Sequence, residues 1–248
     1  MEASCRRALE LGLSAIAFTE HADFTSYVRS RGGLLDILGY HEAVEACRAR
    51  FSELTILSGV ELGEPHRFRD EVAAILAAGP LDRVLGSVHC VPVDGELQDL
   101  GAGGFRITPE AGPALVQAHL SETLRLLRAG RPFEILAHLD YPKRYWPHEA
   151  LQYDELAYEE GYRQVLVEAA RLGVVLEVNT TRGGDPGRCL CPGPRVIGWW
   201  HEVGGSAVSF GSDAHDPSTI ARGFAYAAQA VEAAGFRPAS DPAGYWLR

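Results

Sequence analysis

Six short apolar runs, separated by longer amphipathic segments, are the feature that most limits what this chain can fold into. The runs predict strands at 15–18, 55–60, 83–88, 134–137, 174–178 and 207–210. The remaining segments predict helices at 2–12, 39–51, 66–78, 112–129, 154–171, 193–203 and 217–234, several of them followed by glycine. Strands that alternate with helices favour a parallel sheet, either closed as a (β/α) barrel or open and doubly wound.

The length and composition fit one large α/β domain that spans residues 1–248, because 46% of these residues are hydrophobic and can fill a sizeable core. The chain opens in a predicted helix with no strand before it, so a barrel built from these elements would lack its first strand. Two stretches, 22–38 and 91–113, interrupt the alternation after predicted strands. We expect both to be loops at the carboxyl end of the sheet that take part in substrate recognition.

Charge and cysteine content narrow the class of partner. With 33 acidic and 23 basic residues the formal net charge is -10, so we expect neither nucleic acid nor an anionic membrane as a partner, and a cation or a small substrate instead. The five cysteines do not suggest a disulfide framework. No run approaches the ~20 apolar residues of a membrane span. These features predict a cytoplasmic protein.

A polar side chain follows every predicted strand. The residues concerned are His21, Glu61, His89, His138, Asn179, Asp213 and His215. Taken alone, each would be read as a cap or a loop residue with its own partner. Strand ends of a parallel barrel converge, however, and His with Asp or Glu is the ligand mixture of divalent metals such as Zn, Mn or Fe. In the segment VSFGSDAH (208–215), Asp213 and His215 are two residues apart, so in an extended chain their side chains would point to the same side.

These candidates are too many for one tetrahedral ion, so the sequence predicts a cluster of two or three divalent metal ions, with Glu61 as a bridging ligand. Such clusters commonly hydrolyse phosphate esters. Arg144 and Arg182 lie just past strand ends, where a guanidinium could bind a phosphate. The other histidines, among them His66 and His119, are expected on the surface, and Trp199 and Trp200 are expected to pack in a helix.

The ordered set of strand-end motifs resembles the polymerase and histidinol phosphatase (PHP) superfamily, and most closely its histidinol-phosphatase branch. The motifs are TEH (19–21), GVELGE (59–64), GSVH (86–89), AHLDYPKRY (137–145), LEVNTTRG (176–183) and GSDAH (211–215). The resemblance implies a distorted (β/α)7 TIM-like barrel with a trinuclear metal site. It also implies hydrolysis of L-histidinol phosphate to L-histidinol and phosphate, in histidine biosynthesis.

The resemblance also implies roles for single residues. Glu61 would bridge two ions, with His89 and His138 completing one ion, Asp213 belonging to the second, and His21 with His215 to the third. Asp213 and His215 would be catalytic, and Arg144, Arg182 and Asn179 would bind the substrate. Family members begin with a strand that ends in His-x-His, which this sequence lacks, so we expect a metal-poor chain with weak or no activity.

Two further functions are consistent with the sequence. One is another PHP-type phosphoesterase that acts on nucleotides or as an exonuclease, although the chain has no basic stripe for a DNA path. The other is a degenerate, non-catalytic PHP domain, against which stands the placement of six ligand-type residues at strand ends.

Overall fold

The computed structural model describes residues 1–248 except 31, 94, 103–104 and 184–189. Its helices are α1 (Glu2–Glu10), α2 (Ser26–Ser30), α3 (Ile37–Arg50), α4 (Arg69–Ala77), α5 (Gly112–Arg128), α6 (Glu159–Arg171), α7 (Pro194–Glu202) and α8 (Phe224–Ala233). Short 3-10 turns are η1 (Tyr141–Tyr145), η2 (Glu155–Tyr158) and η3 (Pro217–Thr219). The strands are β1 (Ala15–Ala22), β2 (Thr55–Gly63), β3 (Arg83–Ser87), β4 (Cys90–Val93), β5 (Glu96–Asp99), β6 (Ile135–Leu136), β7 (Val175–Asn179), β8 (Ala207–Gly211), β9 (Arg237–Pro238) and β10 (Trp246–Leu247).

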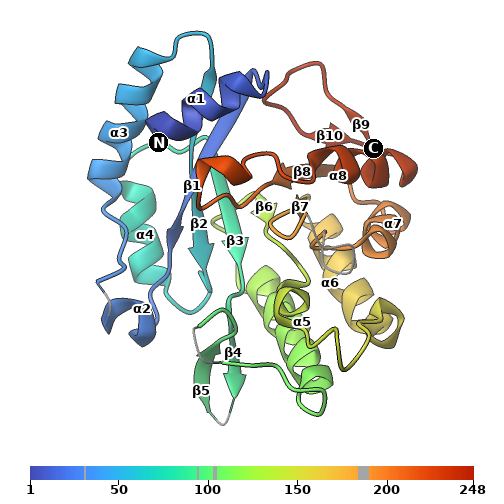
Figure 1. Ribbon diagram of the computed structural model, residues 1–248. Coiled ribbons are helices and arrows are strands. Elements are labelled where there is room, and N and C mark those ends of the chain that lie inside the picture. Colours follow the sequence, from blue (N-terminus) through green and yellow to red (C-terminus); the bar gives the residue numbers. More distant parts are fainter. Residues whose placement is uncertain (31, 94, 103–104, 184–189) are drawn as a thin grey trace.

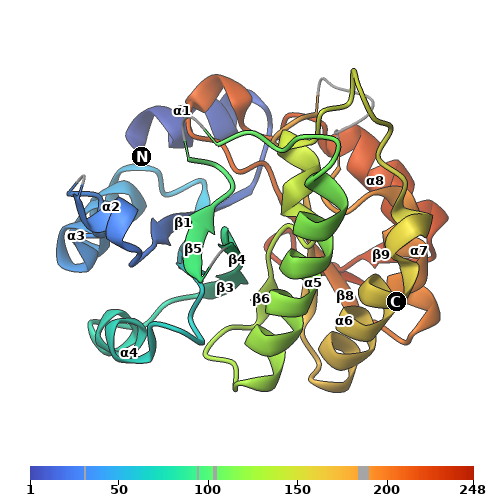
Figure 2. The ribbon, with the colours of Figure 1, turned by 90° about the horizontal axis from the view of Figure 1, so that it is seen from below.

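The main sheet is parallel over most of its width and strongly curved. Its order is β1-β2-β3-β6-β7-β8-β10-β9, and all neighbours from β1 to β8 are parallel. Helices form an incomplete ring outside it, with α3 and α4 on one side and α5 to α8 on the other (Figures 1 and 2). Within the described residues β1 pairs with β2 alone. The sheet is therefore a curled, open form of the predicted distorted TIM-like barrel.

All six predicted strands are present, and several continue beyond the predicted carboxyl end. β1 reaches Ala22 and β2 reaches Gly63, because their backbones stay paired in parallel to the end. This extension places His21 and Glu61 inside the strands as direct neighbours in the pairing register, rather than in the loops that follow.

The two long interruptions contain structure that the sequence analysis did not predict. The stretch 22–38 includes the short helix α2, and 91–113 begins with the antiparallel hairpin β4–β5. Helix α2 and the hairpin β4–β5 both lie towards the lower end of the molecule in Figure 1. The predicted helix 217–234 is divided into η3 and α8, because Ala221 and Gly223 adopt left-handed backbone angles with φ of 56° and 75°.

The largest core cluster lies between the sheet and helices α5, α6 and α7. Trp200 is fully buried, and its indole Nε1 donates a hydrogen bond to the Ala207 carbonyl at 3.0 Å, which fixes α7 against β8. Trp199 is also buried, as the sequence predicted. The four cysteines in the described residues, Cys5, Cys47, Cys90 and Cys191, are buried and unpaired. No helix that the structure describes is long and apolar enough to cross a membrane.

The expectation that His66 and His119 are surface residues is wrong. The ring of His119 is buried on α5, with Nε2 3.0 Å from the Val88 carbonyl oxygen. The His66 side chain is only 7% exposed, and its Nε2 donates to Glu122 Oε1 at 2.6 Å. The carboxylate therefore draws His66 inward, an effect that the position of a histidine in a loop does not reveal.

Glu122 ties helix α5 to the segment that follows β2. Its side chain is 1% exposed and accepts hydrogen bonds from His66, Arg67 and Arg125. Burial alone would raise the pKa of this carboxyl, but the bonds from His66 and Arg67 outweigh burial and lower the pKa to about 2. The negative charge thus stabilises the fold.

We expect Glu122→Gln to lower the free energy of unfolding by about 1–3 kcal/mol at neutral pH, because the buried donors lose a charged acceptor. A folded-state pKa below the ordinary 4.5 stabilises the protein above pH 4.5, and this contribution is lost as the pH falls towards 2. The difference from the wild type, measured by urea unfolding, should therefore shrink over that range. The exposed Glu42→Gln serves as the control, and a difference independent of pH would contradict the assignment.

Candidate metal centre

The ends of four neighbouring strands bring together most of the predicted ligands. His21 lies on β1, and Glu61 lies opposite it on β2 in the pairing register. His89 follows β3 and His138 follows β6, each two residues past the strand end. Because parallel strands end at one edge of the sheet, these four side chains lie close together.

Glu61 is at the centre of this group. It is 5% exposed, and its Oε1 lies 2.7 Å from Nε2 of His138 and 3.0 Å from Nε2 of His89. The two imidazole Nε2 atoms lie 3.3 Å from each other. Two ring nitrogens and one carboxylate oxygen that converge in a buried place form a donor set that suits a borderline divalent cation.

The ionisable side chains of this group change one another's pKa values. Burial would raise the pKa of Glu61, but His138 and His21 hold that pKa well below its usual range. Burial would likewise lower the pKa of His89, yet the carboxylates of Asp23 and Glu61 hold it well above its usual value. For His138 burial prevails and lowers the pKa. His89 and His21, whose pKa values are raised, thus place positive charge beside the buried anionic oxygen of Glu61.

A second group lies at the open side of the sheet. One ligand atom each from His21, Asp213 and His215 lies within 4.8 Å of the others, and His21 also belongs to a similar group with Glu61 and His89. The ring centroids of His21 and His215 are 5.5 Å apart, so the ends of β1 and β8 approach each other. The side chains of His21 and His215 are 40% and 72% exposed.

Asp213 and His215 lie together for a reason other than the predicted one. Strand β8 ends at Gly211, and Asp213 has a left-handed backbone with φ of 48°, so the two residues are not in extended chain. The chain turns at Asp213, and His215 Nδ1 lies 3.1 Å from the Asp213 carbonyl oxygen. The expected proximity is present, but a turn produces it.

Arg144 is held beside Asp213 in the interior. The guanidinium is 7% exposed, its Nη1 lies 2.8 Å from Asp213 Oδ2, and it lies over the ring of Tyr141. Within the described residues its Nε and Nη2 have no hydrogen-bond partner. Burial would raise the pKa of Asp213, but the positive charge of Arg144 opposes burial and the pKa is lowered below its ordinary value. A buried guanidinium with two free donors is suited to bind an anion.

The two other predicted substrate-binding residues differ from each other. Asn179, at the end of β7, is buried, and its Nδ2 lies 3.4 Å from Asp213 Oδ2 and 3.3 Å from Glu177 Oε2. Arg182 is exposed in the turn that follows, and the contacts described for the strand-end cluster do not include it. The structure therefore brings Asn179, but not Arg182, into contact with the cluster.

Three acidic residues that the sequence analysis missed also border the cluster. Asp23 contacts His89 and His21. Glu64 accepts hydrogen bonds from the backbone of His89 and Cys90, and burial raises the pKa of Glu64 to about 7. Glu177 accepts from the His138 backbone N–H at 2.9 Å, and burial together with Glu61 and Asp213 raises the pKa of Glu177 to about 8. A signal was available for Glu177 and Asp23, since each lies two residues from a predicted site residue.

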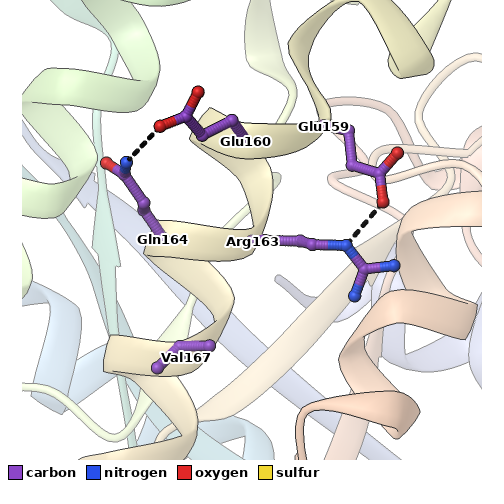
Figure 3. A pocket seen from close by; sticks show the side chains of 5 residues that line it. All are labelled: Glu159, Glu160, Arg163, Gln164 and Val167. Atoms are coloured by element: carbon purple, nitrogen blue, oxygen red, sulfur yellow. Dashed lines mark hydrogen bonds and ion pairs between the residues drawn. The ribbon is translucent and has the colours of Figure 1, made fainter.

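Two surface hollows lie away from this cluster, along α6. One is lined by Glu159, Glu160, Arg163, Gln164 and Val167, whose side chains Figure 3 shows along one helix. Hydrogen bonds within the helix join Gln164 to Glu160 and Arg163 to Glu159. The other lies between α5 and α6. Neither contains a buried group with ligand character, so the strand-end cluster is the candidate site.

Comparison with known proteins gives several relatives that are named histidinol-phosphatase or probable histidinol-phosphatase. The chain is 27% identical to a histidinol-phosphatase of Lactococcus lactis subsp. lactis (strain IL1403) over 212 residues, which cover 84% of this chain and 75% of that protein. It is 26% identical to a protein of Clostridium acetobutylicum named "Probable histidinol-phosphatase", over 90% of this chain and 83% of the relative.

Solved structures show the same fold. The crystal structure of the Lactococcus lactis histidinol phosphate phosphatase, in complex with zinc, L-histidinol and phosphate, matches with a TM-score of 0.75 and 22% identity over 94% of this chain and 86% of that one. A chain from Listeria monocytogenes matches with a TM-score of 0.73 and 17% identity over 91% of this chain and 92% of that one. The model of the PHP domain matches residues 1–181, and this chain therefore belongs to the PHP domain family.

Proposed function

We propose that this chain, acting as one barrel domain, is a metal-dependent phosphomonoester hydrolase that converts L-histidinol phosphate to L-histidinol and phosphate. The observation that carries the proposal is the convergence of Glu61, His89 and His138 beside the buried Arg144. The histidinol-phosphatases among the relatives, one of them solved with zinc, L-histidinol and phosphate, support the choice of substrate.

The chemistry of the donors supports a divalent metal in both groups. Glu61, His89 and His138 would hold one ion, and His21, Asp213 and His215 would hold another, with Glu61 Oε2 lying 3.9 Å from His21 Nδ1 between them. Zn, Mn and Fe all accept this mixture of imidazole and carboxylate. When bound, such ions supply a nucleophilic water at neutral pH and positive charge for the phosphoryl oxygens.

Arg144 is the residue that we assign to the phosphate. Its free Nε and Nη2 would donate to phosphate oxygens, while Asp213 keeps the guanidinium in place through Nη1. Asn179 would add a side-chain amide beside Asp213. We also assign Arg182 to the phosphate as a second contact. This assignment rests on the sequence motif, since the Arg182 side chain is exposed in the turn after β7.

Asp213 and His215 border the open side and are assigned to the reaction itself. Water would attack phosphorus and lose a proton, the bond from phosphorus to the ester oxygen would break, and the leaving alkoxide would take up the proton that the water lost. His215 is the most exposed member of the cluster, so it lies where the alcohol would depart. Asp213, held by Arg144 and Asn179, would stay ionised towards the second ion.

The chain should release phosphate from L-histidinol phosphate when Zn or Mn is added, and a chelator should abolish this turnover, because the donors have no chemistry of their own for the step. Phosphate release would be measured in parallel with a nucleoside monophosphate and at rising salt concentration. Preference for L-histidinol phosphate with little salt dependence agrees with the proposal.

Two outcomes of that assay would contradict the proposal. Equal or faster turnover of the nucleotide would favour another phosphoesterase of the family. Absence of turnover despite bound metal would favour a non-catalytic domain. Metal content, determined by elemental analysis, tests separately the expectation that the chain is metal-poor.

Arg144→Lys should weaken inhibition by inorganic phosphate by roughly 10- to 100-fold, because Lys keeps the charge but loses the planar pair of donors. The inhibition constant and KM would be measured with metal present. Arg171→Gln, which removes an exposed charge on α6, is the matched control and should change neither value. Unchanged phosphate inhibition in the Arg144 variant would remove Arg144 from the phosphate site.

A further inference from the structure

Asp23 connects two of the candidate ligands through one carboxylate. It lies directly after β1, and its side chain is 17% exposed. Its Oδ1 accepts a hydrogen bond from Nδ1 of His89 at 2.9 Å, and its Oδ2 lies 3.3 Å from Nδ1 of His21. Each carboxylate oxygen of Asp23 therefore faces the Nδ1 atom of a different histidine.

The contact with His89 determines which nitrogen can bind a cation. A carboxylate accepts hydrogen bonds and cannot donate, so Nδ1 of His89 must carry a proton in this contact. When the ring holds a single proton, its lone pair is then on Nε2, the atom 3.0 Å from Glu61 Oε1 and 3.3 Å from His138 Nε2. Asp23 thus directs Nε2 of His89, the nitrogen that could bind a cation, towards Glu61 and His138.

The space for Asp23 is built into the pairing of β1 with β2. Ala22 is paired with Leu62, so Asp23 lies next to Gly63. A side chain at Gly63 would collide with Asp23 Oδ1. The absence of a Cβ at Gly63 therefore lets the carboxylate reach His89 across the strand end.

We infer that Asp23 is a positioning residue that sets the tautomer and ring orientation of His89 as a ligand of a divalent cation. The inference rests on the proposed function, because it assigns metal binding to His89. It adds a residue that does not touch the cation itself. Outer carboxylates of this kind typically change metal affinity 10- to 100-fold.

The test is a titration of the purified chain with Co²⁺, followed by visible absorption, with Zn²⁺ affinity measured by competition with a chelator. Asp23→Asn, nearly equal in shape, should lower both affinities by about 10- to 100-fold. Asp23→Glu keeps a carboxylate and should recover part of the loss. Glu20→Gln removes an exposed charge from the same strand and should bind as the wild type does.

Nitrogen NMR of the histidine rings in the Zn²⁺-loaded protein gives a second readout that does not depend on activity. The wild type should show His89 protonated at Nδ1, and the Asn variant should show a mixture of tautomers or loss of the signal. Circular dichroism shows whether each variant is folded, and Asp23→Glu provides the comparison if the Asn variant is not.

The possible outcomes separate the inference from the proposed function. In the first outcome, the wild type binds metal and Asp23→Asn leaves the metal affinity, the absorption spectrum and the His89 tautomer unchanged. This outcome would overturn the role of Asp23 but not the proposed function. A wild-type chain that binds neither Co²⁺ nor Zn²⁺ would overturn the inference together with the metal-dependent function. Reduced turnover in the variant with unchanged metal affinity would likewise contradict the inference.

Discussion

The buried negative charge of Glu61 is the constraint on which the rest of the site depends. A carboxylate that is 5% exposed is costly to keep ionised unless donors or opposite charges surround it. His138 and His89 provide these at 2.7 and 3.0 Å, and this requires that β2, β3 and β6 end at the same level of the sheet. The chemistry of the site therefore depends on the register and curvature of the sheet, because a shift of one strand against its neighbour would separate Glu61 from its partners.

The site is divided into a closed half and an open half. Glu61, His89 and His138 are buried at the ends of paired strands. His21 lies near the end of β1 and His215 lies in the turn after β8, and their rings approach each other although β1 and β8 have no backbone pairing in the described residues. The open half is the part of the site that solvent reaches, since the His21 and His215 side chains are 40% and 72% exposed. The closed half is then the more firmly held part of the site, and the open half can adapt to a bound ligand.

The sequence predicts the closed half of the site better than the open half. A polar residue after an apolar run was sufficient to find His138 and Glu61, because strand ends of a parallel sheet converge. Asp213 and His215 were paired for a reason that the left-handed turn at Asp213 does not support. Asp23 was missed because its importance comes from β1–β2 pairing that reaches Ala22, and pairing is a tertiary property. The hairpin β4–β5 was also missed, although the sequence VDGE contains the Asp-Gly pair that favours hairpins.

Under the proposed function, the charge balance would link the binding of phosphate to the binding of cations. A phosphate monoester brings negative charge towards Asp23, Glu61 and Asp213, and Arg144 is already partly neutralised by Asp213 at 2.8 Å. Two like unit charges 4 Å apart repel by about 4 kcal/mol at an effective dielectric constant of about 20, which exceeds a single hydrogen bond from Arg144. Cations beside Glu61 would reverse this repulsion. Because coupling between two ligands is reciprocal, phosphate should in turn strengthen the binding of the cations, most of all in the open half of the site.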